Sequence, residues 1–478
     1  MSFHRKVDSW SLLSEEQIEQ IHEKSLQLLK NPGVRLASQK AQEILSGHGV
    51  KVNDDIIQIP PELIEENLSK APESFTLHGR NPDNDLQLDR DYTYLSVDGC
   101  SSKTVDFSSG RRRASTKEDI ENVSKIADYL DLIDIVSPIV SAQDTPKQAR
   151  AMHELEAGLT NTEKHVLTES VSTAEEAEQE ISIAAAIAGG RDKLREKPIF
   201  SNFVCTISPL AHDKGGIDAA LTFAEAGVPV GVYSMATAAV SSPITLAGTL
   251  AVINAEVISA LALLELAHPG AKVFYSGGPA TIDLNTGGYV GCSPEAHLLR
   301  GGVGQLASHY GIPSHVGAGA TSAKRTGLQH GTENTLSYLL PTLIDADVLF
   351  GFGLLDGSNL FRYENLVLDH EIAYNIKEIL EGITTDKEDF ALDLIQDLGP
   401  GGVYLNQNHT VENMREALSD PYLSDRQSFE AWEESGEEGV EEKARRKVEE
   451  ILTEHEVAPL PGDVRDQLDS LLAEAEQG

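Results

Sequence analysis

The sequence predicts an α/β protein whose main domain is a closed (β/α)8 TIM barrel. From residue 92 to about residue 385, short runs of β-forming residues alternate with longer runs at helical spacing. Unbroken βα alternation is typical of a parallel sheet, and eight units are the number that closes a barrel. The alternative is an open doubly wound sheet, but no G-x-G-x-x-G follows the first strand. We therefore expect a barrel over residues 92–385.

Eight runs are the predicted strands, and seven helical runs connect them. The strands are "TYLSVDG", "DIVSPIVSA", "HVLTES", "PIFSNFVCTI", "PVGVYSM", "AKVFYSGG", "PSHVGAG" and "VLFGFGL". The longest connecting run is "PITLAGTLAVINAEVISALALLELAHPG", and "ENLVLDHEIAYNIKEILEG" supplies an eighth helix that closes the ring.

Residues 1–91 are expected to form an N-terminal helical and small β segment. Ser14 is a candidate N-cap for the helix in "SEEQIEQIHEKSLQLLKN", and Pro61 suits the first turn of a second helix. "ESFTLHGRNPDNDLQLD" predicts two strands around an "NPDND" turn. Nothing in this segment indicates chemistry.

Residues 386–478 are expected to form a C-terminal acidic helical extension. "GPGG" at 399–402 is typical of a turn at the barrel rim or beyond it. The charge runs in "EEGVEEKARRKVEEILTEHE" indicate a solvated face or an interaction surface.

The formal net charge of −38 excludes some partners. So acidic a surface repels phosphate backbones, which disfavours a nucleic-acid partner. The acidic residues are spread along the chain, which favours a surface adapted to high salt, where screening reduces self-repulsion. The alternative is a field that attracts cations for function.

The cellular setting is expected to be the cytosol, with no membrane partner. No run of 18 or more apolar residues spans a bilayer, and the first residues lack the apolar core of a signal peptide. The three cysteines, Cys100, Cys205 and Cys292, are odd in number and far apart, which favours reduced thiols over a disulfide framework. A homo-oligomer is possible.

The reactive residues of such barrels come from the C-terminal ends of the strands, where the barrel has its mouth. Polar and aromatic residues gather at the predicted ends, with more carboxylates than cations. They are Asp98, Gln143, Asp144, Glu169, Asn202, Cys205, Tyr233, Ser234, Tyr275, Ser276, residues 315–320 and residues 350–356.

Several chemistries are poorly supported at this mouth. The chain has no H-x-H, H-E-x-x-H or C-x-x-C sequence, so we expect no resident metal, and Cys205 is expected to be a buried thiol. There is no G-x-S-x-G elbow for a nucleophilic serine. Lys324 could form a Schiff base as in aldolases, but it lies past the strand end, where an exposed lysine is the default.

Recognition of a methylated ammonium fits this mouth better. A quaternary nitrogen has no N–H, so ring faces and carboxylates must hold it. The available rings are Tyr94, Phe203, Tyr233, Tyr275, Phe350 and Phe352, of which about half should face the helices because side chains alternate along a strand.

Three long segments together resemble the trimethylamine methyltransferase family. They are "SSPITLAGTLAVINAEVISALALLELAHPGAKVFYSGG", "GCSPEAHLLRGGVGQLASHYGIPSHVGAGATSAK" and "DLGPGGVYLNQNHT". The similarity extends from about "VDFSSGRRRASTKEDI" to "NQNHTVENMRE", which is most of the chain.

The resemblance implies a (β/α)8 barrel that moves a methyl group from a methylated amine to the cobalt of a separate corrinoid protein. Founding members carry pyrrolysine where this chain has Ala320, between Gly319 and Thr321. Alanine cannot form the adduct through which pyrrolysine is thought to capture a tertiary amine. This chain therefore resembles the non-pyrrolysine branch, which includes enzymes for quaternary amines such as glycine betaine.

We expect a corrinoid-dependent methyltransferase with glycine betaine as the first candidate substrate and no permanently bound cofactor. The corrinoid, or cobamide, is presented by the cognate corrinoid protein. Trimethylamine, carnitine, choline and proline betaine are alternative substrates, and an aldolase using Lys324 or a non-catalytic amine-binding barrel are alternative functions.

The predicted site follows from the task of holding a cation and aligning one methyl group. The catalytic candidates are Asp98, Glu169 and His315, with Asp98 or Glu169 balancing the ammonium. The substrate-binding candidates are Tyr94, Gln143, Asn202, Tyr233, Tyr275, Gly319, Ala320, Phe350 and Phe352. Each of them has a purely structural alternative: Glu169 could cap the next helix, and His315 could be core.

Overall fold

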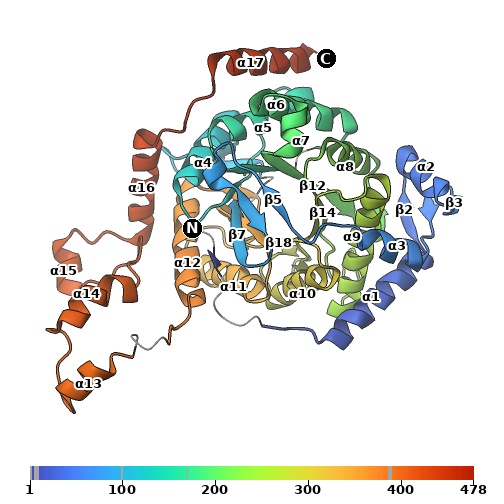
Figure 1. Ribbon diagram of the computed structural model, residues 1–478. Helices are drawn as coiled ribbons and strands as arrows, with labels where there is room; N and C mark the ends of the chain where they lie inside the picture. Colours follow the sequence, from blue (N-terminus) through green and yellow to red (C-terminus); the bar gives the residue numbers. More distant parts are fainter. Residues whose placement is uncertain are drawn as a thin grey trace.

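A ring of eight parallel strands forms the centre of the molecule (Figure 1). The computed structural model describes residues 3–4, 10–97, 99, 101–169, 171–385 and 390–477. Pairing of β19 with β7 and of β11 with β12 closes the ring, so the predicted barrel is confirmed. The strands are β7 (Tyr92–Val97), β10 (Ile135–Val136), β11 (His165–Thr168), β12 (Phe200–Ile207), β14 (Val230–Ser234), β15 (Val273–Gly277), β18 (Ser314–Gly317) and β19 (Val348–Phe352).

Helices surround the ring, one after each barrel strand, with a short additional helix after α6. Helices α6, α8 and α10 begin at a side-chain N-cap and end at a glycine in the left-handed conformation, so the sequence itself fixes both ends. The outer helices are α4 (Lys117–Tyr129), α5 (Arg150–Thr160), α6 (Ala174–Ala188), α7 (Arg191–Glu196), α8 (Lys214–Ala226), α9 (Leu246–Ala267), α10 (Pro294–Tyr310), α11 (Leu328–Leu343) and α12 (Tyr363–Leu380).

Helix α9 is apolar on all sides because it is enclosed by protein. It packs against β14 and β15 inside and against the N-terminal helices outside. Within the described residues it is the one helix long and apolar enough to cross a bilayer, but 89% of that stretch is buried in the fold. Its composition is therefore that of a core helix.

The N-terminal segment covers one side and one end of the barrel (Figure 1). Helix α1 (Glu15–Lys30) starts at a capping box of Ser14 and Gln17, and α3 (Pro61–Leu68) starts at Pro61, as expected. The predicted pair of strands is also confirmed, as β5 (Phe75–Leu77) and β6 (Leu86–Leu88) around the short helix η1 (Pro82–Asn84). The remaining elements are β1 (Phe3–His4), β2 (Val34–Leu36), α2 (Gln39–Gly47), β3 (Val52–Asn53) and β4 (Ile56–Ile57).

Short strands not expected from the sequence follow the C-terminal ends of several barrel strands. Strand β12 runs beyond the ring and pairs with β13 (Ala211–His212), which joins β2. A four-stranded sheet combines the segments after the first and the last barrel strands, β8 (Lys103–Val105), β9 (Arg112–Ala114), β20 (Leu354–Leu355) and β21 (Leu360–Phe361). After β15 comes the hairpin of β16 (Thr281–Ile282) and β17 (Tyr289–Val290).

The C-terminal extension runs around the outside of the barrel (Figure 1). Helix α16 (Val440–Glu454) packs against α12 and α4, and α17 (Gly462–Gln477) packs against α6 and α5. The other helices of the extension are α13 (Leu392–Leu398), α14 (Asn408–Ala417) and α15 (Phe429–Glu434).

Candidate functional site

Alternate residues of the strands fill the inside of the barrel. One buried apolar cluster takes side chains from seven barrel strands, which only the barrel interior allows. Its members are Tyr94, Ile135, Leu167, Phe203, Tyr233, Phe274, Val348 and Phe350, together with the β5–β6 side chains Phe75, Leu77, Leu86 and Leu88. The alternate positions on the same strands belong to the larger cluster shared with the helices.

The N-terminal end of the barrel is closed by the β5–β6 hairpin. The ring of Phe75 meets Phe274 edge-on, with 5.1 Å between ring centroids. The hydroxyl of Tyr94 donates to the carbonyl of Gln87, 2.9 Å away on β6. Tyr94 therefore faces inward at the closed end, away from the mouth where it was expected to contact a substrate.

His315 lies in the middle of the barrel, among rings. Its ring centroid is 4.6 Å from Phe350 and 5.4 Å from Phe203, and Nε2 has no hydrogen-bond partner among the described residues. Burial lowers the pKa of His315 to about 3, so the imidazole is neutral at pH 7. It packs beneath Tyr233 as part of the aromatic core. His315 therefore has the core role that was the alternative to a catalytic one.

Glu169 stands at the open, C-terminal end of the barrel. It continues the inward alternation of Leu167 on β11 and is half-buried. A Cβ added to Gly99, which follows the end of β7, would overlap the Glu169 carboxylate. Glycine at position 99 thus makes room for this carboxylate between the first and third barrel strands. Asp98, the other carboxylate candidate, lies outside the described residues together with Cys100.

Tyr233 forms part of the floor of the mouth, with Cys205 beside it. The Tyr233 ring stacks on Phe203, with centroids 4.8 Å apart, and Cys205 is its register partner on β12. A Cβ on Gly278 or Gly317 would overlap the Tyr233 hydroxyl, so these two glycines give it space.

Cys205 was expected to be buried, but its side chain is exposed in the mouth. The surrounding protein raises the pKa of its thiol to about 12, and the nearby charge of Glu169 adds to the effect. The thiol therefore stays protonated at pH 7 and is a poor nucleophile.

Three substrate-binding candidates face the helices and do not line the mouth. Tyr275 donates to Asn254 of α9, 2.8 Å away, and Phe352 stacks on Tyr338 of α11 with centroids 4.5 Å apart. Asn202 is fully buried and donates to Thr168 at 2.9 Å, at positions that alternate with inward-facing Leu167 and Phe203. Strand alternation decides these orientations, and the sequence alone did not fix its phase.

Gly319 and Ala320 lie where the ends of β18 and β19 approach closely. Gly319 has φ +68°, and a side chain there would overlap the Gly351 carbonyl. The Cβ of Ala320 is 2.7 Å from the position a Cβ would take on Gly291. Ala320 is buried, so the small residues let two backbone segments pack against each other at the mouth.

Tyr289 is an aromatic residue at the mouth that was not among the candidates. It lies on β17 and is 40% exposed. Its ring neighbours Gly357, 3.4 Å from where a Cβ would lie, and its hydroxyl is 3.0 Å from the same position on Gly291, beside Ala320. The available signal was an aromatic residue between glycines, in "TGGYVGCS".

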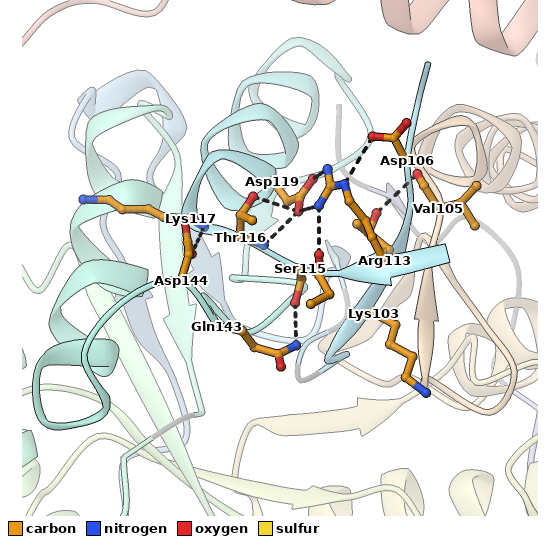
Figure 2. Close-up of polar contacts among 12 residues, drawn as sticks. Lys103, Val105, Asp106, Arg113, Ser115, Thr116, Lys117, Asp119, Gln143 and Asp144 are labelled. Carbon is orange, nitrogen blue, oxygen red and sulfur yellow. Dashed lines mark hydrogen bonds and ion pairs between the residues drawn. The ribbon is translucent and has the colours of Figure 1, made fainter. Parts of the chain in front are cut away.

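Gln143 and Asp144 hold the segments around the start of α4 (Figure 2). Gln143 is exposed, and its amide donates to the Ser102 carbonyl and to Ser115 Oγ, 3.4 Å away. Asp144 accepts from the backbone N–H of Lys117 at 2.8 Å, at the positive end of α4. Both residues therefore hold neighbouring backbone segments in place.

Buried carboxylates on the outer helices accept hydrogen bonds from the ends of the barrel strands, on the side that faces the helices. Glu256 of α9 accepts from Thr206, Ser208 and Ser234 and from the Leu210 N–H, at 2.6 to 2.8 Å. Burial raises the pKa of Glu256 in spite of these donors. It ties β12 to β14, the strands that carry Cys205 and Tyr233. The detectable signal was an acidic residue, one of two in α9, within an otherwise apolar helix.

Lys324 is not poised for Schiff-base chemistry. Its side chain is 70% exposed, and Nζ lies 2.7 Å from an Asp356 carboxylate oxygen. Within the described residues, no group of three or more His, Cys, Asp or Glu side chains is arranged to hold a metal ion.

The rim beside the floor is apolar and exposed. Ile207, at the end of β12, is 45% exposed, and Met235, just after β14, is 44% exposed. Ile207 and Met235 therefore form an apolar, partly exposed edge at the ends of the neighbouring strands β12 and β14.

Comparison with known proteins places this chain among methyltransferases. The family model described as "Trimethylamine methyltransferase (MTTB)" matches residues 2–478. The chain is 34% identical to trimethylamine methyltransferase MttB of Desulfitobacterium hafniense (strain DSM 10664 / DCB-2), over 98% of this chain and 95% of that protein. It is 30% identical to the glycine betaine methyltransferase of Desulfitobacterium hafniense (strain Y51), over 98% of both proteins.

A solved structure also shares the fold. The monomethylamine methyltransferase MtmB of Methanosarcina barkeri aligns with a TM-score of 0.54 at 11% identity, over 98% of this chain and 88% of that one. At this identity the likeness concerns the fold alone.

Proposed function

This chain belongs to the trimethylamine methyltransferase family and is a methyltransferase, and we propose that its methyl donor is a quaternary amine, with glycine betaine first. The proposed acceptor is the cobalt(I) of a cognate corrinoid protein. The observation that carries the proposal is an inward carboxylate, Glu169, above the aromatic floor of Tyr233. The resemblance to the family adds that this chain has Ala320 where founding members carry pyrrolysine.

Glu169, Tyr233 and Tyr289 are the proposed contacts of the ammonium group. A quaternary cation offers no N–H, so a carboxylate and ring faces are the groups that attract it. Glu169 supplies the charge, Tyr233 lies at the floor, and Tyr289 stands beside Ala320 with 40% of its surface exposed. Asp98 remains a second proposed carboxylate, and Phe350 supports the floor through its contact with Tyr233.

For this reaction the protein must orient one N–CH₃ bond and exclude water. The N–CH₃ bond breaks with its electron pair left on nitrogen, so a quaternary substrate leaves as a neutral tertiary amine without prior activation. The cobalt(I) corrinoid, when presented, supplies the nucleophile that accepts the methyl group. The residues present fit such a group, because the exposed side chains of Ile207 and Met235 form an apolar edge at the mouth.

The protonation state of Cys205 supports direct transfer of the methyl group to an external acceptor. It is the exposed thiol at the floor, but its raised pKa keeps it protonated near Glu169. A protonated thiol does not compete for the methyl group. In this proposal, the chain binds and aligns the donor and contributes no nucleophile of its own.

The test is turnover with a panel of amines. The chain is mixed with a reduced corrinoid protein, and loss of the cobalt(I) absorbance is followed with glycine betaine, choline, carnitine, proline betaine, trimethylamine and dimethylglycine. We expect quaternary amines to react and tertiary amines to fail. Reaction with trimethylamine alone would overturn the quaternary assignment, and no reaction with any amine would favour a non-catalytic binding barrel.

Replacement of Asp98 separates the two carboxylate candidates. If both carboxylates balance the ammonium, Asp98→Asn lowers kcat/KM for glycine betaine as Glu169→Gln does. An unchanged kcat/KM in Asp98→Asn removes Asp98 from the site and leaves the charge to Glu169.

A further inference from the structure

The four-stranded sheet of β8, β9, β20 and β21 lies at the mouth, because its strands follow the C-terminal ends of β7 and β19. One face of this sheet packs on the barrel, since Leu354 and Phe361 are fully buried members of the main core cluster. Phe361 pairs with Thr104, and Thr104 pairs with Arg113, so these two residues share the inner face. The outer face of the sheet therefore points away from the barrel core.

Two exposed cations lie on this outer face. Lys103 and Arg112 alternate along their strands with the inner-facing Thr104 and Arg113, and Arg112 lies opposite Val105. Both cations are exposed, whereas Val105 is half-buried. Figure 2 shows Lys103 pointing away from the carboxylates that surround Arg113. The two cations therefore flank a small apolar spot that is open to solvent on both sides.

The loop after β18 adds two more exposed cations beside the same spot. Ala323 of this loop belongs to a small buried cluster with apolar side chains of the outer face. Lys324 and Arg325 follow directly and are exposed. Segments far apart in the chain thus bring four cations together at one side of the mouth. We call Lys103, Arg112, Lys324 and Arg325 the basic rim.

Most of the basic rim is not neutralised by carboxylates. Among the residues that the structure describes, three of the four side chains make no ion pair, and the fourth, Lys324, pairs with Asp356 at 2.7 Å. Arg113 on the inner face differs, because Asp106 and Asp119 hold it at 3.2 and 2.6 Å (Figure 2). The inner cation therefore has a structural role, while the outer ones keep their charge available.

The basic rim contrasts with the charge of the whole chain. Segments 101–116, 318–327 and 353–362 contain seven basic and two acidic residues, although the chain has 38 basic and 76 acidic ones. They follow β7, β18 and β19, which are neighbours in the ring. One side of the mouth therefore has a positive local field on a chain of net charge −38.

The shape of the basic rim favours a protein partner over a small anion. All four side chains are exposed and come from two surface segments, so they form an open surface and not an enclosed subsite. Open charged surfaces of this kind attract a partner of opposite charge and orient it. A nucleic acid would be repelled by the rest of this acidic chain. The basic rim therefore fits the acidic face of another protein.

We propose that the basic rim is the docking site for an acidic face of the cognate corrinoid protein. This inference rests on the proposed function, which requires that protein to reach the mouth. The net charge of −38 repels an acidic protein everywhere else, so the basic rim selects the approach that ends at the mouth. The strands that carry the rim lie across the ring from β12, where the apolar edge begins.

The first test is binding in the absence of any amine, with the corrinoid protein of the amine panel as the fluorescent probe. The double variant Lys103→Glu/Arg112→Glu should raise the Kd about tenfold at low salt and less at high salt. Lys51→Glu/Lys197→Glu is the matched control: it makes the same charge change at exposed residues of the N-terminal segment and the closed end. Its Kd should stay close to that of the wild type, and equal Kd values for the two double variants overturn the proposal.

The second test compares two methyl acceptors. With the corrinoid protein, Lys103→Glu/Arg112→Glu should lower kcat/KM about tenfold, whereas with free cob(I)alamin it should react like the wild type. Equal losses with both acceptors overturn the proposal, because the change then acts on the amine site or on the fold. Circular dichroism establishes that each variant is folded.

Two further outcomes are decisive. A single-stranded RNA probe that binds the wild type more tightly than the corrinoid protein does, and that the rim variant fails to bind, assigns the basic rim to nucleic acid and overturns the proposal. If no amine reacts, the proposed function fails, but a Kd that rises in the rim variant and not in the control still supports docking at the basic rim.

Discussion

The two ends of the barrel use the same inward positions of the strands in opposite ways. At the N-terminal end, Phe274 and Tyr94 meet the β5–β6 hairpin and leave no opening. At the C-terminal end, Gly99, Gly278 and Gly317 have no side chain at positions where a Cβ would overlap Glu169 or Tyr233. These two side chains therefore have space. The same alternation of strand residues therefore produces a packed core at one end and a site at the other, and only the choice of side chain differs.

The largest expected effect comes from opening the closed end. Phe274→Ala removes a buried ring that packs on Phe75 and should lower the free energy of unfolding by about 3 to 5 kcal/mol. The folded fraction should keep its kcat, because Phe274 lies below the floor of the mouth. Denaturant unfolding and turnover measure the two quantities, with Phe429→Ala at an exposed ring as control.

A loss of kcat in folded Phe274→Ala without a loss of stability would contradict the division between the two ends. It would mean that the ring acts on the substrate and does not serve as core.

At the open end, Glu169→Gln should lower activity and leave stability nearly unchanged, which is the opposite of the effect of Phe274→Ala. It keeps the shape of the side chain and removes the charge, so kcat/KM for glycine betaine should fall by about 100-fold, equivalent to roughly 2.7 kcal/mol. The thermal unfolding temperature should change little, because Glu169 is half-buried. A variant with unchanged kcat/KM would show that Glu169 does not contact the ammonium.

His315, between the two ends, gives a prediction about pH. Its pKa is lowered to about 3 in the folded chain against an ordinary value near 6.5. The unfolded chain therefore binds the additional proton first, and the stability contributed by the neutral ring is lost as pH falls below about 6.5. Removing the imidazole in His315→Leu should remove this loss.

The measurement is the difference in unfolding free energy between His315→Leu and the wild type. Between pH 7 and pH 5 this difference should move by about 2 kcal/mol in favour of the variant. A difference that is constant with pH would show that His315 is protonated or solvated in the folded chain.

The smallest expected effect concerns the ring at the rim. Tyr289→Leu should weaken glycine betaine binding by about two- to fivefold, since an exposed cation–π contact contributes about 0.5–1 kcal/mol. Tyr289→Phe keeps the ring and should bind like the wild type. Calorimetric titration of both variants tests this, and equal weakening by Leu and Phe would assign the effect to the hydroxyl instead of the ring.

The sequence predicted the strands and their order because βα alternation, helix caps and glycine C-caps are local signals. It placed Glu169 and Tyr233 at the mouth for the same reason. It could not fix which alternate residues point inward, so Tyr275, Phe352 and Asn202 were expected at the mouth although they face the helices. That phase is set by packing between segments far apart in the chain.

Contacts between segments far apart in the chain also could not be predicted from local sequence patterns. The closure of the barrel bottom brings β6 onto Tyr94, and the loop after β15 brings Tyr289 beside Ala320. Glu256 was hidden for a similar reason, since its four donors come from two strands and a loop that the sequence does not place together.

The central claim is that the open end recognises a methylated cation through Glu169. Its most direct test compares the binding of glycine betaine with that of 3,3-dimethylbutanoate, which has the same shape with carbon in place of the charged nitrogen. Calorimetry at high salt compares both ligands on the wild type, on Glu169→Gln and on Glu412→Gln, a surface control. We predict at least about a tenfold preference for glycine betaine in the wild type and the control, and none in Glu169→Gln. Equal affinity of the wild type for both ligands would contradict the account.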